Sequence, residues 1–314
     1  MNIEYVIVAD WGSSHLRAYL CQRNVQNTLT VIESTKGEGV TKVDKQFEQH
    51  LMQVLSPWRQ KYGQLPILLS GQVGSTVGWK EATYLPCPVS PAKLAAACLS
   101  FQCQGHEIYI LPGLSCEIPD KHPDVMRGEE LQIFGLQLQD AKYQQGRHLI
   151  CLPGTHTKWA LVENGEIQIF KTAMTGELYD LLTTHSVLIQ KKTENFDLDA
   201  FKLGVDKATH SSVGCFSHNI FSVRTKQLFG QLSQENACSY LSGLLIGSDV
   251  HAAIDAHEWN ISEFTEVTIV GSNHLSSCFA IALTIQGVKA NVADEAAVAI
   301  AGYSGVYQSL FLDK

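Results

Sequence analysis

Hydrophobic and polar positions alternate in short stretches at the start of the chain. Residues 5–9 form an apolar run with β-branched side chains, which is typical of a buried strand. Residues 15–21 place Leu16, Ala18 and Leu20 on one face and polar side chains on the other, a period of two. A tight Trp-Gly-Ser-Ser link joins the two runs, and residues 28–34 form a third. The pattern predicts an antiparallel meander of three strands.

The period then changes to that of a helix and back again. Apolar side chains in residues 47–62 recur at helical spacing and predict one amphipathic helix. Residues 65–69 predict a strand that runs into a glycine-rich loop, SGQVGSTVGW, at residues 70–79. A further strand is expected at residues 106–111, and a helix at residues 125–138.

The second half of the chain repeats the opening pattern. Residues 149–152 are an apolar strand, followed by the turn PGTHTK, a second strand, an Asn164-Gly165 hairpin and a third strand at residues 166–172. We interpret this as a diverged internal duplication. The later pattern predicts helices at residues 174–182, 236–256 and 294–310, and strands at residues 267–270 and 288–292.

Two lobes are therefore expected, residues 1–138 and 139–314, and the last helix is a candidate to pack back toward the N-terminal lobe. Residues 193–215 are polar and mixed and poorly readable, and the role of residues 193–232 as a whole is open. We leave their structure and any sites in them open.

Composition and charge narrow the function classes. The 314 residues carry a net charge of −8, so a nucleic-acid partner is not expected. No apolar run approaches the roughly 20 residues of a membrane helix, and the N-terminus lacks the basic start of a signal peptide. Nine scattered cysteines, an odd number, favour reduced thiols in a cytoplasmic protein. Oligomeric state is left open.

The first turn has the chemistry of a phosphate site. Asp10 ends the first strand, Gly12 allows close approach of the backbone, and Ser13 and Ser14 add hydroxyl donors. Backbone N–H groups in such a turn form an anion-binding concavity. The carboxylate would repel a phosphate unless a cation lay between them, and Mg²⁺ needs only one or two carboxylates. Arg17 would add a fixed positive fork.

The second turn repeats these residue types without the aspartate. Gly154, Thr155, His156, Thr157 and Lys158 stand at the matching place in the second half. Two facing turns from duplicated halves would clamp the polyphosphate of ATP. An ordinary hairpin turn remains the alternative for either motif taken alone.

Eight ordered segments carry a resemblance to a known family. They are ADWGSSHLRAYL (9–20), SGQVGSTVGWKEATYL (70–85), ILPGL (110–114), VMRGEE (125–130), LPGTHTKW (152–159), TAMTGELYDLL (172–182), LSGLLIGSDV (241–250) and VGSN (270–273). On these segments the chain resembles the 2-dehydro-3-deoxygalactonokinase family, within the actin-like ATPase and sugar kinase superfamily. The resemblance implies an α/β fold with two RNase-H-like lobes and a nucleotide cleft between them.

The same resemblance implies an activity and cofactors. The chain would transfer the γ-phosphoryl group of ATP, with Mg²⁺, to the 6-hydroxyl of 2-dehydro-3-deoxy-D-galactonate in galactonate breakdown. Asp10 would hold the Mg²⁺ through water. The first turn would bind phosphate with Gly12, Ser13, Ser14 and Arg17, and the second with Gly154, Thr155 and Thr157, with His156 or Lys158 near the phosphates. Gly271 and Ser272 would approach the adenosine.

A carboxylate is needed to orient the attacking hydroxyl, since positioning dominates phosphoryl transfer. Glu129 is our candidate, at the expected start of a helix and in a stretch similar to the GxEE segment of exopolyphosphatases. Arg127 would lie close to the transferred phosphoryl group or to the sugar acid. Glu130 and Glu177 are the alternative bases, and all three glutamates are also explained as ordinary residues at the start of a helix.

The glycine-rich loop is the candidate substrate site. Gly71 and its neighbouring glycines allow close approach, Gln72 and Ser75 offer hydrogen bonds, Trp79 would form a wall, and Lys80 would meet the carboxylate of the acid. Glu177 is a further substrate-site candidate. The alternative is a surface loop with a structural tryptophan.

Other functions stay open at this point. A kinase of the same fold could act on another sugar acid or a hexose, because a single stereocentre is read by contacts that the sequence does not place. A non-enzymatic ATP-binding scaffold of the actin type and a polyphosphate hydrolase are the remaining alternatives.

Overall fold

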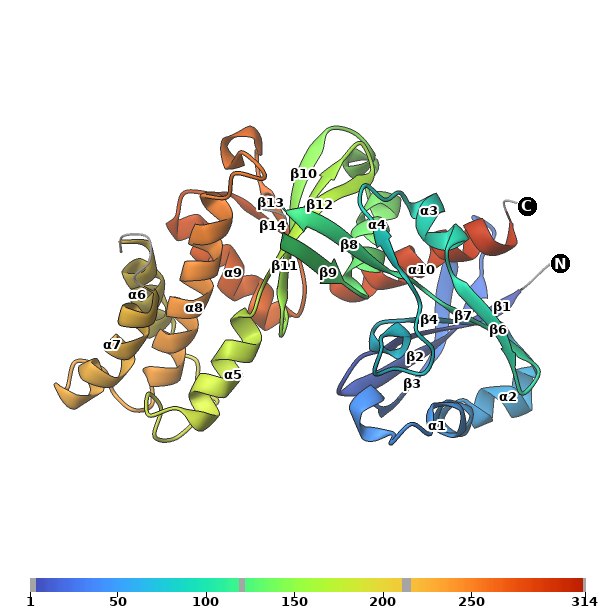
Figure 1. Cartoon of the computed structure of the whole chain (residues 1–314), viewed down its shortest axis with the longest axis horizontal. Helices are drawn as coiled ribbons and strands as arrows, with labels where there is room; N and C mark the ends of the chain where they lie inside the picture. Colours follow the sequence, from blue (N-terminus) through green and yellow to red (C-terminus); the bar gives the residue numbers. More distant parts are fainter. Residues whose placement is uncertain (1–3, 119–121, 211–215, 313–314) are drawn as a thin grey trace. The chain divides into compact units, whose positions relative to one another are not determined.

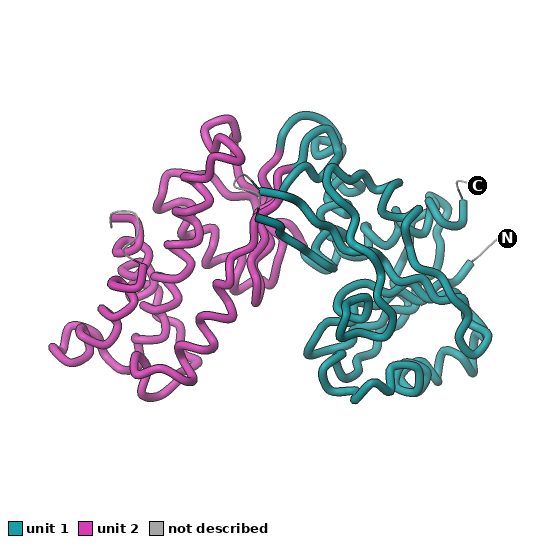
Figure 2. The backbone as a smooth tube through the Cα atoms, in the orientation of Figure 1, with its two compact units in different colours: residues 1–147, 162–169, 295–314 teal, residues 148–161, 170–294 magenta. Residues whose placement is uncertain are grey.

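The computed structural model describes residues 4–118, 122–210 and 216–312. The chain forms two compact units, coloured separately in Figure 2. The first comprises residues 1–147, 162–169 and 295–314, and the second comprises residues 148–161 and 170–294. The chain therefore enters the second unit more than once, whereas the expected lobes, 1–138 and 139–314, are each continuous. That lobe boundary stays a prediction.

A six-stranded sheet organises the first unit. Its order is β3-β2-β1-β4-β7-β6. The strands are β1 (Tyr5–Trp11), β2 (His15–Arg23), β3 (Leu29–Glu38), β4 (Ile67–Ser70), β6 (Leu99–Cys103) and β7 (His106–Ile110). β1, β2 and β3 pair antiparallel, which confirms the predicted meander, and β1, β4 and β7 run parallel. The carboxyl ends of these three parallel strands consequently meet at one edge of the sheet.

One face of this sheet is covered by two short helices instead of the single helix predicted for residues 47–62. They are α1 (Phe47–Val54) and α2 (Ser56–Tyr62). Pro57 lies in the first turn of α2 and has no N–H to continue the hydrogen bonding of α1, so the helix is interrupted at Leu55. The apolar stripe still packs on the sheet, where Leu51, Leu55 and Trp58 are buried.

The prediction of a helix from residue 125 is wrong at its start. β9 (His122–Met126) is a strand, and α4 (Glu129–Gln139) begins three residues later. Gly128 separates them with φ +111°, a backbone conformation that ends any right-handed helix. β9 belongs to a small sheet of order β5-β8-β9 that the sequence pattern did not predict, with β5 (Tyr84–Pro86) and β8 (Gly113–Ile118). α3 (Pro91–Ala96) follows β5.

The last helix, α10 (Glu295–Phe311), packs against α4 within the first unit. Gly135 lies against the backbone of Val298, and Gly302 lies against the backbone of Leu131, so neither position has room for a Cβ. The backbones of α4 and α10 therefore cross closely. α10 also contacts the carboxyl end of β4, because the hydroxyl groups of Tyr303 on α10 and Ser70 on β4 are 2.6 Å apart.

The second sheet has the order β12-β11-β10-β13-β14. Its strands are β10 (Arg147–Leu152), β11 (Thr157–Glu163), β12 (Glu166–Ala173), β13 (Val267–Val270) and β14 (Ala290–Ala293). This is the order of β3-β2-β1-β4-β7 in the first sheet, so the repeat predicted from the sequence is present in the topology. A meander followed by two parallel strands is the RNase-H-like order, and the predicted fold class is confirmed.

Helices make up the rest of the second unit. α8 (Ala237–Ile254) packs against four others (Figure 1), which are α5 (Thr175–His185), α6 (Leu198–Thr209), α7 (Phe216–Leu228) and α9 (Asn273–Ile285). α6 and α7 lie in the stretch that the sequence left unread, of which residues 211–215 are outside the described part. Short 3₁₀ helices are η1 (Val40–Lys42), η2 (Gln72–Gly74), η4 (Ala141–Gln144) and η5 (Ile261–Glu263).

Candidate functional site

The first turn is held by hydrogen bonds to its carbonyl groups from residues 39–41. The N–H of Gly12 donates to the carbonyl of His15 at 3.0 Å and closes the turn. The carbonyls of Gly12, Ser13 and Ser14 accept hydrogen bonds from the N–H groups of residues 39–41, at 3.0 to 3.2 Å. Because a trans peptide directs its N–H opposite to its carbonyl, the N–H groups of Ser13 and Ser14 point away from residues 39–41. Both serines are exposed, so these donors are open to an anion.

Asp10 lies at the carboxyl end of β1, opposite Arg17 of β2. Desolvation, with a smaller contribution from the nearby Glu129 and Glu295, raises the pKa of its carboxyl group to about 6, and Arg17 opposes the shift. Arg17 is itself exposed. A partly buried carboxylate with two more acids nearby is an environment that a cation would relieve, so these residues fit Mg²⁺ held by one or two carboxylates and waters.

Two glycines bring other segments up to Asp10. Gly71 follows β4 with φ +87°, and a Cβ there would lie 2.9 Å from Oδ1 of Asp10. Gly128 has φ +111°, and a Cβ there would lie 3.6 Å from the Cα of Gly71. The end of β1, the glycine-rich loop and the RGEE segment therefore converge within the first unit, as the predicted site requires.

The two adjacent glutamates of α4 have different surroundings. Glu129 is partly exposed, and its Oε2 accepts a hydrogen bond of 3.0 Å from the N–H of Arg127. Glu130 is fully buried, and both of its carboxyl oxygens accept from the N–H of Gly128, at 2.9 and 2.8 Å. Burial raises the pKa of Glu130 to about 8, with a further contribution from Glu129. Of the two, Glu129 is the carboxylate that a substrate could reach.

Arg127 carries a buried guanidinium group whose hydrogen bonding is incomplete. Its Nη2 donates to the carbonyl of Ala82 at 2.8 Å, and its Cζ lies 4.3 Å from the ring centre of Tyr84. The residue is 7% exposed, and among the described residues its Nε and Nη1 have no hydrogen-bond partner. Gly74 makes room for this group, because a Cβ there would lie 2.9 Å from Nη1. Buried donors without partners are uncommon and favour an additional acceptor.

The glycine-rich loop is compact, and its two ends face different parts of the unit. Gln72 is partly exposed, while the hydroxyl of Ser75 is buried and donates to the carbonyl of Gln72 at 2.7 Å. Trp79 packs edge-to-face on Phe101 of β6 with ring centres 5.1 Å apart, and Nζ of Lys80 lies 4.5 Å above the same ring. The structure thus places the side chains of Trp79 and Lys80 against β6, whereas Gly71 lies at Asp10.

The second turn joins β10 to β11 and is packed against the start of α5. Gly176 lies directly on the backbone of Gly154 and Thr155, with no room for a Cβ, and the N–H of Glu177 donates to the carbonyl of Thr155 at 2.9 Å. Nε2 of His156 is 2.5 Å from Oε2 of Glu177. The structure therefore brings together the PGTHTK and MTGEL motifs and places Glu177 at the second turn, in the second unit.

Thr157 and Lys158 begin β11 and are both buried. Nζ of Lys158 donates to the hydroxyl of Thr172 on β12 at 2.7 Å. His156 is exposed at the turn. Of the two cations predicted near the phosphates, His156 has its side chain at the surface of the turn and Lys158 directs its amine toward β12.

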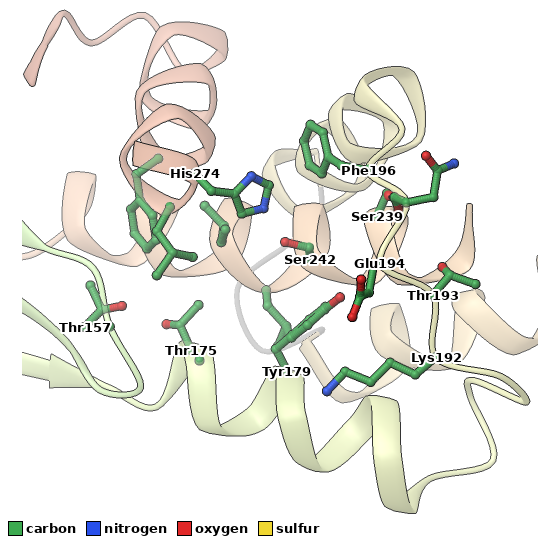
Figure 3. A pocket seen from close by; sticks show the side chains of 17 residues that line it. Thr157, Thr175, Tyr179, Lys192, Thr193, Glu194, Phe196, Ser239, Ser242 and His274 are labelled. Atoms are coloured by element: carbon green, nitrogen blue, oxygen red, sulfur yellow. The ribbon is translucent and has the colours of Figure 1, made fainter. Parts of the chain in front are cut away.

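A cavity of about 350 Å³ opens beside this turn within the second unit. Figure 3 shows Tyr179 of α5, Ser242 of α8 and His274 of α9 around the hollow. Its walls come from the turn, α5, the segment before α6, α8 and α9, with these lining residues: Gly154, Thr157, Thr175, Gly176, Tyr179, Lys192, Thr193, Glu194, Asn195, Phe196, Ser239, Ser242, Leu245, Ile246, His274, Leu275 and Phe279. A largely apolar hollow with a few polar groups is the usual form of a small-molecule site.

The sequence predicted only part of this cavity. Gly271 and Ser272 lie between β13 and α9: Gly271 packs on Pro153, and Ser272 is exposed just before the helix. Neither is among the lining residues, although His274 and Leu275 just beyond them are. Residues 192–196 form a wall that sequence reasoning missed, because their polar composition has no periodic signal. Ser239 and Ser242 lie in the helix predicted for residues 236–256, but the sequence pattern assigned them no role.

Three further observations bear on the predicted metal, on membranes and on the cysteines. Among residues 4–118, 122–210 and 216–312, no cluster of three or more His, Cys, Asp or Glu side chains could hold a metal ion. The predicted Mg²⁺ at Asp10 would therefore be bound mainly through water. None of the helices described is long and apolar enough to cross a membrane. No disulfide joins the described cysteines.

Comparisons with known proteins show the family to which the chain belongs. A family model described as 2-keto-3-deoxy-galactonokinase matches residues 10–306. A "Probable 2-dehydro-3-deoxygalactonokinase" of Rhizobium meliloti (strain 1021) is 31% identical over 318 residues, covering 98% of this chain and 98% of the relative. The 2-dehydro-3-deoxygalactonokinase of Escherichia coli (strain K12) is 35% identical over 267 residues, covering 83% of this chain and 85% of the relative.

A solved structure agrees with the sequence relatives. The crystal structure of a Sinorhizobium meliloti protein, also named as a 2-dehydro-3-deoxygalactonokinase, superposes with a TM-score of 0.86 at 30% identity and covers 99% of this chain and 98% of that chain. The predicted family, fold class and enzyme class are confirmed. The chain is a kinase of the actin-like ATPase and sugar kinase fold, and it belongs to the 2-keto-3-deoxy-galactonokinase family.

Proposed function

We propose that the chain transfers the γ-phosphoryl group of ATP to the 6-hydroxyl of 2-dehydro-3-deoxy-D-galactonate, giving the 6-phosphate and ADP in galactonate catabolism. One observation supports this most directly: a reachable carboxylate, a partly buried aspartate and an incompletely bonded arginine converge on one glycine-rich loop. These are Glu129, Asp10 and Arg127. The set suits an acceptor that has a hydroxyl group at one end and an acid at the other.

Glu129 is proposed as the residue that orients the attacking hydroxyl and accepts its proton. It lies at the start of α4, partly exposed, and near Asp10, as its effect on the pKa of Asp10 shows. Asp10 would hold Mg²⁺ through water, and that ion, when bound, neutralises charge on the phosphates. The open N–H groups of Ser13 and Ser14, with Gly12 and Arg17, would bind phosphate oxygens.

Arg127 is proposed to bind the carboxylate of the sugar acid. Its guanidinium is buried beside Tyr84 and Ala82, and Nε and Nη1 have no partner among the described residues. A charged buried donor gains most from an anionic acceptor, and the planar guanidinium matches a carboxylate. Gly71 and Gln72 of the glycine-rich loop would contact the rest of the sugar chain. The Ser75 hydroxyl, which donates to the carbonyl of Gln72, would stabilise the loop.

The second unit is proposed to bind the nucleotide. The cavity of about 350 Å³ is largely apolar and ends at Gly154 and Thr157 of the second turn, so adenosine would occupy the hollow with its phosphates at the turn. Thr155 and His156 lie exposed on that turn, and Glu177 orients His156. Gly271 and Ser272 would approach the adenosine from the start of α9.

The experiment is ADP release in a coupled assay with MgATP and a panel of acceptors: 2-dehydro-3-deoxygalactonate, its gluconate epimer, galactonate and glucose. Glu129→Gln and Glu130→Gln form a matched pair, since the same change is made at adjacent positions. We expect Glu129→Gln to lower kcat by about 10²- to 10⁴-fold, the usual contribution of a general base. Glu130→Gln keeps its oxygen acceptor for Gly128 and should retain most of kcat.

The panel also separates the alternatives. Preference for the galactonate-derived acid supports the proposal, and preference for the epimer or for glucose would replace the substrate. If Glu129→Gln kept its full kcat, the base would lie elsewhere, with Glu177 the next candidate. ATP binding without turnover on any acceptor would contradict the proposed activity.

A further inference from the structure

A buried aspartate lies behind the nucleotide cavity, in the segment LSGLLIGSDV (241–250), to which no role has been assigned. Asp249 is on α8 and is 8% exposed. Its Oδ1 accepts from Nε1 of Trp159 at 2.9 Å, and its Oδ2 accepts from the hydroxyl of Thr175 at 2.5 Å. Burial raises the pKa of Asp249 to about 6, while the hydroxyl and indole groups of Thr175, Trp159 and Thr157 favour its ionised form.

These partners come from two other elements, β11 and α5, so one carboxylate joins three elements. Thr157 and Thr175 also line the cavity, and Figure 3 shows their hydroxyl groups turned toward each other. Asp249 is not among the lining residues. It therefore lies one layer behind the hydroxyls and would not touch a ligand.

The start of α5 transmits this anchoring to the phosphate turn. Thr175 is the first residue of α5, next to Gly176, which packs on the backbone of Gly154 and Thr155 without room for a Cβ. The N–H of Glu177 binds the carbonyl of Thr155. A shift of the first turn of α5 would thus displace residues 154–155 directly.

We infer that Asp249 is a positioning residue for the nucleotide: it fixes the hydroxyl of Thr175 and the indole of Trp159 and, through α5, the backbone of the second turn. This rests on the proposed nucleotide site. Burying a carboxylate costs desolvation free energy that burying a neutral side chain would not. The gain is in positioning, because a carboxylate with both oxygens hydrogen-bonded fixes one arrangement of its partners. The second turn lacks the strand-end aspartate of the first, and α8 supplies a carboxylate here instead.

The test compares three variants by kinetics and by direct binding of ADP in calorimetry. Asp249→Asn keeps the size of the side chain but replaces one acceptor oxygen with a donor. Trp159→Phe removes the indole donor alone. Trp259→Phe is the matched control, because Trp259 is equally buried at 2% and its Nε1 donates to the carbonyl of Ala253 at 2.7 Å, away from the cavity lining.

We expect Asp249→Asn and Trp159→Phe to raise KM for ATP and Kd for ADP by about fivefold or more, as for loss of a charge-assisted hydrogen bond, and to leave KM for the sugar acid unchanged. Trp259→Phe should lower Tm and leave the KM and Kd values unchanged. The inference is overturned if Asp249→Asn binds ADP like wild type, or if Trp259→Phe weakens ADP as strongly. Should Asp249→Asn not fold, Trp159→Phe decides.

The binding arm separates this inference from the proposed activity. ADP binding needs no turnover of a sugar acid, so an inactive wild type that binds ADP would count against the proposed substrate and still test Asp249. A wild type that phosphorylates the acid while Asp249→Asn binds ADP normally would count against Asp249 alone.

Discussion

At the scale of single residues, the candidate site depends on glycines that let carboxylates and backbones approach. Gly71 combines a positive φ with a position where a Cβ would lie 2.9 Å from Oδ1 of Asp10 and 3.0 Å from the carbonyl oxygen of Trp11. The sequence predicted that this loop was glycine-rich for close approach, but not that its first glycine meets Asp10. That contact depends on the parallel pairing of β1 with β4, which aligns Asp10 with Ser70.

Gly71→Ala is therefore expected to displace Asp10 and to strain the backbone. We expect kcat/KM for the sugar acid to fall by about 100-fold, as for an error of about 1 Å in a positioned group. The control is Gly63→Ala, at φ +74° with nothing within 4 Å of the added Cβ. It should cost about 1–3 kcal/mol of unfolding free energy through strain and leave kcat/KM unchanged. Equal activity in the two variants would contradict this account of Gly71.

At the scale of elements, the first turn of α4 separates two chemically identical side chains. The sequence favoured Glu129 over Glu130 because of its place in the motif, and that choice stays a prediction. The complete burial of Glu130 depends on how α4 packs with its neighbours, among them α10, nearly 170 residues farther along the chain. The spacing of hydrophobic residues along the sequence therefore did not predict that Glu130 is buried.

The burial of Glu130 predicts a pH dependence of stability. Its pKa is raised from 4.5 to about 8, so between these values the folded state holds a proton that the unfolded state releases. The free energy of unfolding should thus fall as pH rises from about 5 to 8, by up to about 1.4 kcal/mol per pH unit. Glu130→Gln should lose that part of the slope in denaturant titrations, whereas Glu81→Gln, at an exposed carboxylate, should not. If the free energy of unfolding depended on pH equally in wild type and Glu130→Gln, the raised pKa of Glu130 would be contradicted.

Elements whose hydrophobic residues recur at regular spacing could be predicted, and element boundaries that depend on a single glycine or proline could not. The meander of β1, β2 and β3 follows from alternation and tight turns. The start of α4 differs from the prediction because Gly128 adopts φ +111° and separates a strand from the helix. The helix predicted for residues 47–62 is two helices, because Pro57 interrupts it although the apolar stripe continues. The sheet β5-β8-β9 consists of short strands whose exposure has no clean alternation.

At the scale of the whole molecule, the chain uses one topology twice with different chemistry. Both sheets share one strand order, and each has a glycine and hydroxyl turn after its first strand. In the first unit Asp10 lies at the end of the strand that leads into the turn; in the second unit we infer that Asp249, on a helix behind the cavity, supplies the corresponding carboxylate. The duplication could be predicted from sequence, because local turns preserve it. The cavity wall at residues 192–196 could not, since it is defined only by packing among helices.

The measurement that tests the central claim most directly is phosphorus and carbon NMR of the product formed from MgATP and 2-dehydro-3-deoxygalactonate. We predict one new phosphate ester, coupled to the C6 position of the acid and formed in equal amount with ADP. Inorganic phosphate and ADP without a sugar phosphate, or an ester on any other oxygen, would contradict the claim that this chain is a 6-kinase of that acid.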